Sequence, residues 1–308
     1  MPLNLPLEIS VITCAHNPRA DYLHEVLGAL NQQTLAKARW EYLLIDNLSD
    51  EPLDSRFDLS WHPHAKHLKE EKLGLTAARL RGIKEAAGEV LVFVDDDNVL
   101  DADYLEEVNR LAEAWPMVGA FSGQVRGKFE VPPPEWSRAY WNRLAIREFD
   151  KDSWSNLACL SETSPNGAGL CVRRAVARRY LSYHANGKRK ILLDRTGTSL
   201  VSAGDLDLAA TACDMGLGNA LFASLKLDHL MPPERLEEKY LLNLLEAQTF
   251  SQIVLDSFRA NGQAPLRPTR SRTVANLLRL LFMEPRKRRF FRALNRGISK
   301  GFDFLAHQ

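Results

Sequence analysis

The sequence predicts an α/β protein with a mostly parallel, doubly wound sheet flanked by helices and a basic, helical C-terminal extension. Three observations lead to this prediction. Short apolar segments rich in β-branched residues alternate with longer segments of helical periodicity, which is typical of βαβ units. Several of the apolar segments end abruptly in acidic residues. Residues 265–308 combine eleven Lys or Arg residues with an apolar stripe at helical spacing.

The first half of the chain shows the clearest alternation. Residues 8–15 (EISVITCA) predict a strand, and the Asn17-Pro18 turn separates it from an amphipathic helix over 22–33. Gly88 is the expected stop signal of the second helix. The elements that follow the first helix are a strand over 42–46, a helix over 75–87, a strand leading to Asp95, a helix over 102–115 and a strand over 118–122.

The second half is less regular. The segment that begins at Gly127, GKFEVPPPEW, holds three consecutive prolines and precedes an aromatic-rich stretch with Trp136, Tyr140, Trp141 and Trp154. This segment is either a substrate-covering loop or an irregular crossover with aromatic plugs. Regular elements are expected again over 168–172 (strand), 205–215 (helix), 221–227 (strand) and 234–260 (helix, opened by a proline pair).

Composition and charge exclude several classes. With 308 residues and 45% hydrophobic content the chain can bury a large core, so intrinsic disorder is not expected. The four cysteines show no metal or C-x-x-C spacing, which favours reduced thiols in the cytoplasm. Neither a signal peptide nor a membrane-spanning segment is predicted. Residues 265–308 carry a net +9 and the rest of the chain −8, so an acidic body precedes a basic tail.

Residues 89–98 (EVLVFVDDDN) are the most informative segment. A buried strand delivers Asp95, Asp96 and Asp97 to its carboxyl end, where ligands bind in open α/β sheets. Clustered carboxylates repel one another unless a hard divalent cation joins them. The segment therefore suggests a metal-bridged diphosphate substrate, although a polar turn that caps the next helix would use the same residue types.

Six segments, in their order along the chain, resemble the family 2 glycosyltransferases, which are inverting GT-A-fold enzymes that use nucleotide-diphosphate sugars. The segments are SVITCAHN (10–17), LIDNLSD (44–50), KLGLTAARLRGI (72–83), VDDDN (94–98), PNGAGLCVRRA (165–175) and SAGDLDL (202–208). A further segment, DHLMPPERLEEKYL (228–241), resembles a pattern found in part of the family. The resemblance covers residues 8–245 and departs from the family at Gly204, where a Glu is usual.

The resemblance implies a role for each candidate site residue. The nucleotide would be contacted by Ala15, Asn17, Asp46, Arg79, Asp95 and Asp96. A divalent cation, Mn²⁺ or Mg²⁺, would be held by Asp97 and His229. The general base would be Asp205, with Asp207 as the alternative, and the acceptor would be contacted by Trp136, Asn166, Gly167 and Asp207. The implied domains are a nucleotide-binding half (1–125), an acceptor-binding half (126–264) and a tail (265–308).

The implied reaction is transfer of a sugar to an acceptor hydroxyl, with a UDP-sugar as the favoured donor and a glycan or lipid-linked acceptor. A metal ion would neutralise the leaving diphosphate, and a carboxylate would take the proton of the acceptor hydroxyl. A sugar nucleotidyltransferase is one alternative, but residues 13–19 lack the glycine-rich basic loop that it needs. A non-catalytic binding or scaffold protein is the other, and Gly204 keeps it open. A dinucleotide oxidoreductase is disfavoured, since no G-x-G-x-x-G follows the first strand.

Two features allow more than one interpretation. His229 is either a ligand or a histidine that merely caps a strand end. The tail places its apolar stripe at Phe290, Leu294, Ile298, Phe302 and Leu305. Such a helix over 286–305 either lies on an anionic membrane surface or docks on the acidic body or a second subunit. Nucleic acid binding is not expected, because no reading module accompanies the charge.

Overall fold

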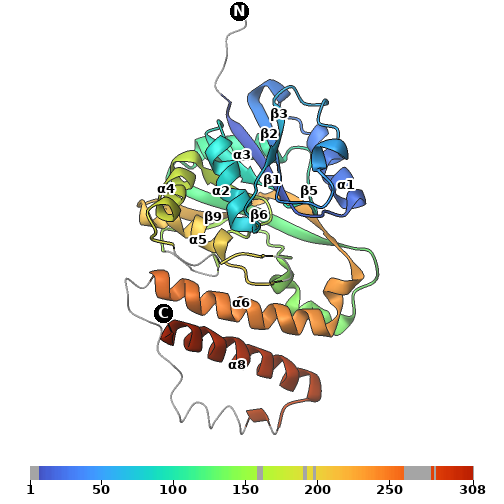
Figure 1. Cartoon of the computed structure of the whole chain (residues 1–308), viewed down its shortest axis with the longest axis vertical. Helices are drawn as coiled ribbons and strands as arrows, with labels where there is room; N and C mark the ends of the chain where they lie inside the picture. Colours follow the sequence, from blue (N-terminus) through green and yellow to red (C-terminus); the bar gives the residue numbers. More distant parts are fainter. Residues whose placement is uncertain are drawn as a thin grey trace, which may run out of the picture.

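The computed structural model describes residues 7–157, 162–189, 193–196, 199–259, 279–280 and 282–307. Within these residues the strands form a nine-stranded mixed sheet with helices on both faces (Figure 1). The strands are β1 (Ile9–Ala15), β2 (Trp40–Asp46), β3 (Ala65–Lys69), β4 (Val90–Phe93), β5 (Asn98–Leu100), β6 (Val118–Phe129), β7 (Ser153–Ser155), β8 (Leu170–Arg173) and β9 (Gly218–Met231).

The sheet order is β3-β2-β1-β4-β8-β6-β9-β5, with β7 paired to β9. Strands β3, β2, β1 and β4 are parallel, as are β6 and β9, whereas β8, β5 and β7 run antiparallel to their neighbours. Because β8 enters between β4 and β6 from the opposite direction, the turn after β4 and the loop before β8 meet at one edge. The predicted α/β class is confirmed, and this edge is where the site lies.

Helices cover the sheet in two layers. They are α1 (Ala20–Asn31), α2 (Leu75–Glu85), α3 (Tyr104–Ala114), α4 (Arg174–Ala185), α5 (Gly204–Asp214), α6 (Glu238–Arg259) and α8 (Pro285–Ala306), with short 3-10 turns η1 (Lys37–Arg39), η2 (Leu53–Ser55), η3 (Glu135–Leu144) and η4 (Pro233–Leu236). One apolar core joins α1 and α3 to the sheet, and a second joins α2, α4 and α5 to the other face. Burial of these amphipathic faces is the main stabilising contribution.

Tertiary pairing lengthens some of the predicted elements. Strand β6 was expected to end at Ser122 but continues to Phe129, because it stays paired with β9 beyond an irregular register at Gly123. A Cβ at Gly123 would lie 2.1 Å from the Leu225 carbonyl oxygen, so the close approach of the two strands requires glycine there. The border predicted between residues 125 and 126 falls inside β6, and the border at 264 lies outside the described residues.

The sequence suggested that Gly88 stops α2, but the structure does not place it at the end of that helix. The helix ends at Glu85, and Gly88 instead lies on β1, where a Cβ would be 2.4 Å from the Ile9 carbonyl carbon. The predicted helix over 234–260 is divided into η4 and α6, and Ala260 lies outside the described residues.

The tail helix α8 packs along α6 below the sheet (Figure 1). Its contact face is made largely of small residues: Ala293, Gly297 and Gly301 are buried, and a Cβ at Gly297 would lie 2.5 Å from the Glu246 carbonyl oxygen. The predicted stripe is buried only at Phe290 and Phe302. The apolar stripe thus docks on this chain, which is one of the two interpretations that the sequence left open.

Ion pairs reinforce this docking. Arg286 and Arg289 pair with Glu238, and Arg296 and Lys300 pair with Glu246, both glutamates being on α6. The acidic residues of the body therefore meet part of the basic charge of the tail. Among the described helices, none is both long enough and apolar enough to cross a bilayer.

Candidate functional site

A cavity of ≈ 630 Å³ opens at the sheet edge where the turn after β4 and the loop before β8 meet. Its wall combines the ends of strands with the first turns of α2 and α5 and with parts of α6 and α8. The sequence-predicted residues that it brings together are Ala15, Arg79, Asp95, Asp96, Asp97, Asn166, Gly167, Asp205 and His229. Residues as far apart in the chain as Ala15 and His229 thus share one cavity, as expected for a site built on strand ends.

The three aspartates follow β4 in a tight turn, in which the Asn98 amide donates to the Asp95 carbonyl oxygen at 3.1 Å. Burial, with the charges of Asp97 and Asp95, raises the pKa of Asp96 to about 7. Burial also raises the pKa of Asp95, and Arg79 offsets part of that effect. Two of the three carboxyl groups thus have raised pKa values, because burial and mutual repulsion disfavour their charged forms.

Asp97 already has a cationic partner from the chain itself. Its Oδ2 lies 2.8 Å from Arg235 Nη2 and 3.3 Å from His229 Nε2, and Arg235 Nη1 lies 2.9 Å from His229 Nε2. Burial would raise the pKa of Asp97, but positively charged neighbours that include Arg235 outweigh it, so the pKa of Asp97 is lowered. His229 Nδ1 lies 3.0 Å from the Leu144 carbonyl oxygen, so the bonding pattern assigns the proton to Nδ1 and a lone pair to Nε2.

The carboxylate of Asp97 and the imidazole of His229 are ligand types that suit a divalent cation. A carboxylate oxygen and a neutral imidazole nitrogen point to one place, and the second ring nitrogen is fixed by a carbonyl, as in metal-ligating histidines. Within the described residues no three His, Cys, Asp or Glu side chains gather to form a complete protein cage. A cation here would need ligands from the substrate, and Arg235 would have to give way.

Arg79 projects from α2 into the same cavity and is buried. Its Nη1 lies 3.0 Å from Asp194 Oδ2, which also accepts a hydrogen bond from Thr76 Oγ1 at 3.1 Å. Although burial opposes it, the carboxylates of Asp194, Asp95 and Asp205 raise the pKa of Arg79. Burial raises the pKa of Asp194 to about 6. The guanidinium is thus a permanent cation held among three acids.

Asp205 stands in the first turn of α5 and faces the cavity. Its Oδ1 accepts a hydrogen bond from the Leu206 amide at 2.9 Å. A Cβ at Gly167 would lie 2.7 Å from Asp205 Oδ2 and 3.3 Å from Arg79 Nη2, so glycine at 167 lets the loop before β8 approach both groups. Asn166 beside it donates its side-chain amide to the Ala145 carbonyl oxygen at 3.3 Å.

Four predicted residues do not line the cavity, and Asp46, Asn17 and Trp136 are three of them. Asp46 is buried and caps the turn after β2, accepting from the Ser49 and Leu53 amides at 2.9 and 3.1 Å. Asn17 pairs with Asp50 at the surface. Trp136 packs against Phe290 of α8, with Arg286 4.5 Å above its ring. Tyr140 and Trp141 join the same apolar cluster, as the aromatic-plug interpretation expected, whereas Trp154 is 51% exposed.

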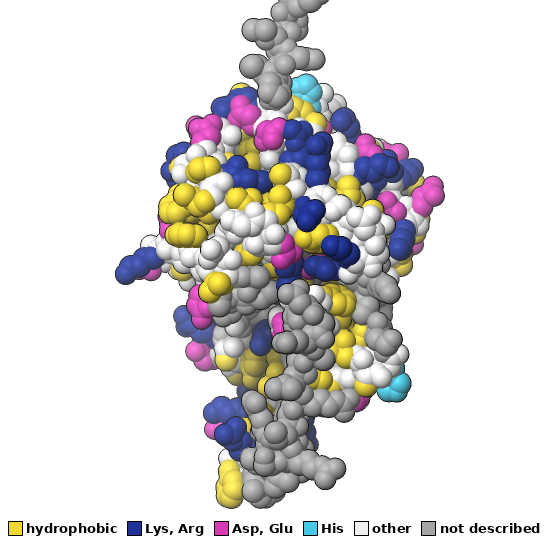
Figure 2. All heavy atoms as spheres, turned by 90° about the vertical axis from the view of Figure 1, so that its left-hand side faces the viewer, with side chains coloured by type: hydrophobic (Ala, Val, Ile, Leu, Met, Phe, Trp, Pro, Cys, Tyr) yellow, Lys and Arg dark blue, Asp and Glu magenta, His cyan; other side chains and the backbone are white. Residues whose placement is uncertain are grey.

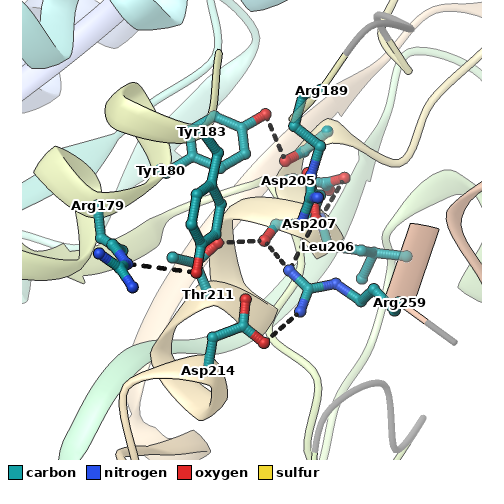
Figure 3. Close-up of polar contacts among 11 residues, drawn as sticks. Arg179, Tyr180, Tyr183, Arg189, Asp205, Leu206, Asp207, Thr211, Asp214 and Arg259 are labelled. Carbon is teal, nitrogen blue, oxygen red and sulfur yellow. Dashed lines mark hydrogen bonds and ion pairs between the residues drawn. The ribbon is translucent and has the colours of Figure 1, made fainter. Parts of the chain in front are cut away.

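Asp207 is the fourth predicted residue that does not line the cavity, and it is held in a buried ion-pair network (Figure 3). Arg189 Nε lies 2.6 Å from its Oδ2, and Arg259 Nη2 lies 2.7 Å from its Oδ1. Arg259 also reaches Asp214 at 3.0 Å. Asp207 as a whole is 3% exposed and is not part of the cavity wall, so its surroundings indicate a structural role linking α5 to α6.

We expect Asp207→Asn to lower the free energy of unfolding by about 3–5 kcal/mol, because it leaves two buried guanidiniums without their shared carboxylate. Denaturant unfolding measures this loss. Asp214→Asn is the matched control on the same helix, since Asp214 meets Arg259 at a more exposed position. Equal stability of the two variants would contradict the structural role.

The sequence interpretation missed several cavity residues, among them Asp194, Asn47 and Arg235. Asp194 ends an apolar run, ILLD, of the same kind as YLLID at the end of β2, and that pattern could have found it. Asn47, rather than Asp46, lines the cavity, and its amide holds the 70–74 loop through Glu70, Lys72 and Gly74. Arg235 lies in a charged segment, PPERLEEKYL, in which nothing distinguishes it from its neighbours.

Comparison with known proteins decides the family. The sequence model of the protein family described as glycosyl transferase family 2 matches residues 10–165, just over half of the chain. The chain belongs to glycosyl transferase family 2. Among curated family relatives, Glycosyltransferase AglE of Haloferax volcanii is 30% identical over 109 residues, which are 34% of this chain and 35% of AglE. The chain thus matches about a third of that relative's length.

Solved structures show the same fold. S. aureus TarS has a TM-score of 0.53 at 15% identity, covering 90% of this chain but only 43% of that one. TarS 1–349 in complex with UDP has a TM-score of 0.51 at 17% identity, covering 98% and 92% of the two chains. The complex of TarS 1–349 with UDP-GlcNAc gives 0.52 at 14% identity, covering 98% and 93%. These likenesses place the family 2 chain in the GT-A fold type.

Proposed function

We propose that this glycosyltransferase moves a sugar from a nucleotide-diphosphate sugar, with a UDP-sugar favoured, to an acceptor hydroxyl with inversion at the anomeric centre. The observation that carries the proposal is the shared cavity. Asp95, Asp96 and Asp97 line it together with Arg79 and Asp205, which come from two different helices. The fold shared with a protein solved in complex with UDP and UDP-GlcNAc supports the choice of donor.

The charges of the cavity suit a diphosphate leaving group. Arg79 would bind a phosphate oxygen, because its guanidinium is buried, charged and lines the cavity. Mn²⁺ or Mg²⁺, held by Asp97, His229 and diphosphate oxygens, would supply charge neutralisation as the sugar–phosphate bond breaks. Arg235, displaced from Asp97, would remain near the same oxygens as a second cation.

Asp205 would act as the general base. An acceptor hydroxyl is a weak nucleophile until a positioned carboxylate takes its proton, and Asp205 is an acid at the cavity wall with no arginine ion pair among its described contacts. A single displacement then forms the bond from the acceptor oxygen to the anomeric carbon as the bond to the diphosphate breaks. Asn166 and Gly167, which line the same wall, would contact the acceptor.

The acceptor class and location belong to the same proposal. We favour a glycan or lipid-linked acceptor in surface polysaccharide or glycolipid synthesis, with the protein in the cytoplasm at the membrane surface. Lys and Arg side chains are visible at the lower end of the molecule, at the level of α6 and α8 (Figure 2). On α8, Lys287 and Arg292 are exposed and could meet anionic headgroups while the apolar stripe stays docked on α6.

Titration calorimetry with UDP, GDP and dTDP tests the donor site, first with Mn²⁺ and then with EDTA. We expect one diphosphate to bind in the presence of metal, EDTA to weaken that binding, and Asp97→Ala to abolish the metal-dependent part. The variant removes one of two protein ligands, so the loss should be at least about tenfold. If none of the three diphosphates binds under either condition, the donor-site proposal is wrong.

A further inference from the structure

Position 204 departs from the family pattern, and the structure shows what occupies the space of its missing side chain. A Cβ at position 204 would lie 2.3 Å from Asp194 Oδ2 and 2.7 Å from Asp194 Cγ. Real Cβ atoms do not approach other atoms this closely, so a larger residue at 204 and the present Asp194 conformation exclude each other. The carboxyl group of Asp194 therefore stands where the side chain of a residue at 204 would begin.

Asp194 reaches this position on a segment that bridges two helices. The Ala203 and Gly204 amides, at the start of α5, both donate to the Leu193 carbonyl oxygen, at 2.7 and 2.9 Å. On the other side, the Leu75 amide, at the start of α2, donates to the Arg195 carbonyl oxygen at 3.0 Å. The backbone on both sides of Asp194 is thus anchored, and its carboxylate is aimed at Arg79 and Thr76.

The alternative is that Asp194 only stabilises the fold. Its burial and its two hydrogen bonds to α2 fit that role, but Asp194 also lines the cavity, and its Oδ2 touches the nitrogen of a cavity cation. Asp194 and Asp205 both interact with the charge of Arg79, and repulsion between these acids adds to burial in raising the pKa of Asp194. A purely structural acid would not need to share the cavity wall with the candidate base.

We propose that Asp194 is a positioning residue that holds Arg79 toward the donor diphosphate and supplies, from a different segment, the carboxylate that the chain lacks at position 204. This inference rests on the proposed function, because it assigns Arg79 to the diphosphate. The proposal makes a specific claim. Arg79 requires this carboxylate beside it, and the carboxylate can come from position 194 or from position 204.

Relocation of the carboxylate tests the claim in full-length protein. Asp194→Ala should weaken binding of the nucleoside diphosphate and lower donor turnover by about 100-fold, because Arg79 loses its anchor. Gly204→Glu alone should be inactive or unstable, since its Cβ meets the Asp194 carboxyl. The double variant Asp194→Ala/Gly204→Glu should recover at least about tenfold over Asp194→Ala, because the new Glu side chain begins in the vacated space.

Thermal unfolding and diphosphate affinity are measured for each variant, with Asp58→Asn as a surface control. Recovery of affinity in the double variant supports the proposal when its thermal stability stays at the level of Asp194→Ala, since a gain that came only from refilling the vacated space would raise both together. A double variant that folds but binds no better than Asp194→Ala overturns it, as does an Asp194→Ala protein with wild-type affinity. If the wild-type protein itself binds no diphosphate, the proposed function fails instead.

Discussion

Replacement of Asp205 by Asn is expected to reduce donor turnover by about 10²–10⁴-fold and to leave nucleotide affinity within the range of the wild type. The amide keeps the size of the carboxylate and can still accept from the Leu206 amide, but it cannot take a proton from an acceptor hydroxyl. Release of the nucleoside diphosphate, with a panel of acceptor sugars and with water alone, gives the turnover. Calorimetry gives the affinity.

Asp214→Asn is again the matched control, because Asp214 ends the same helix and does not line the cavity. It should turn over the donor as the wild type does. An Asp205→Asn protein with wild-type turnover would remove Asp205 from the role of base. Loss of nucleotide binding together with turnover would place Asp205 at the donor instead.

Replacement of Arg235 by Gln is expected to raise the affinity of the nucleotide-free protein for Mn²⁺. In the structure the guanidinium contacts both Asp97 and His229, so a metal ion must first displace it. A hydrogen bond to a charged group contributes about 1.5–3 kcal/mol, which corresponds to roughly 10- to 100-fold in affinity. Electron paramagnetic resonance of free Mn²⁺ measures the change without any turnover.

Arg126→Gln is the control for this experiment. Arg126 also bridges two acids, Asp101 and Asp228, but it does not line the cavity, so its loss should leave Mn²⁺ affinity unchanged. Equal Mn²⁺ affinity in the wild-type and Arg235→Gln proteins would mean that Asp97 and His229 do not form the cation site. The double variant Arg235→Gln/Asp97→Ala should lose the gain in Mn²⁺ affinity that Arg235→Gln alone produces.

Local patterns in the sequence pointed to several residues that the structure brings into one cavity. Asp95, Asp96 and Asp97 follow a buried strand, and Asp205 begins a helix, so their positions depend on neighbours close in the chain. The structure places two other predicted residues, Asp46 and Trp136, outside the cavity. An acid at a strand end can turn to cap its own loop, and an aromatic residue in an irregular segment can join a core.

The sequence alone determined the α/β class, the family resemblance and the amphipathic character of the tail, because periodicity and strand-end chemistry are local properties. Only the tertiary structure decided which side chains meet: Arg235 with Asp97, Asp194 with Arg79 and Gly204, and the small-residue face of α8 with α6. These contacts join segments far apart in the chain. Their partners are selected by packing and charge in three dimensions, which no local pattern records.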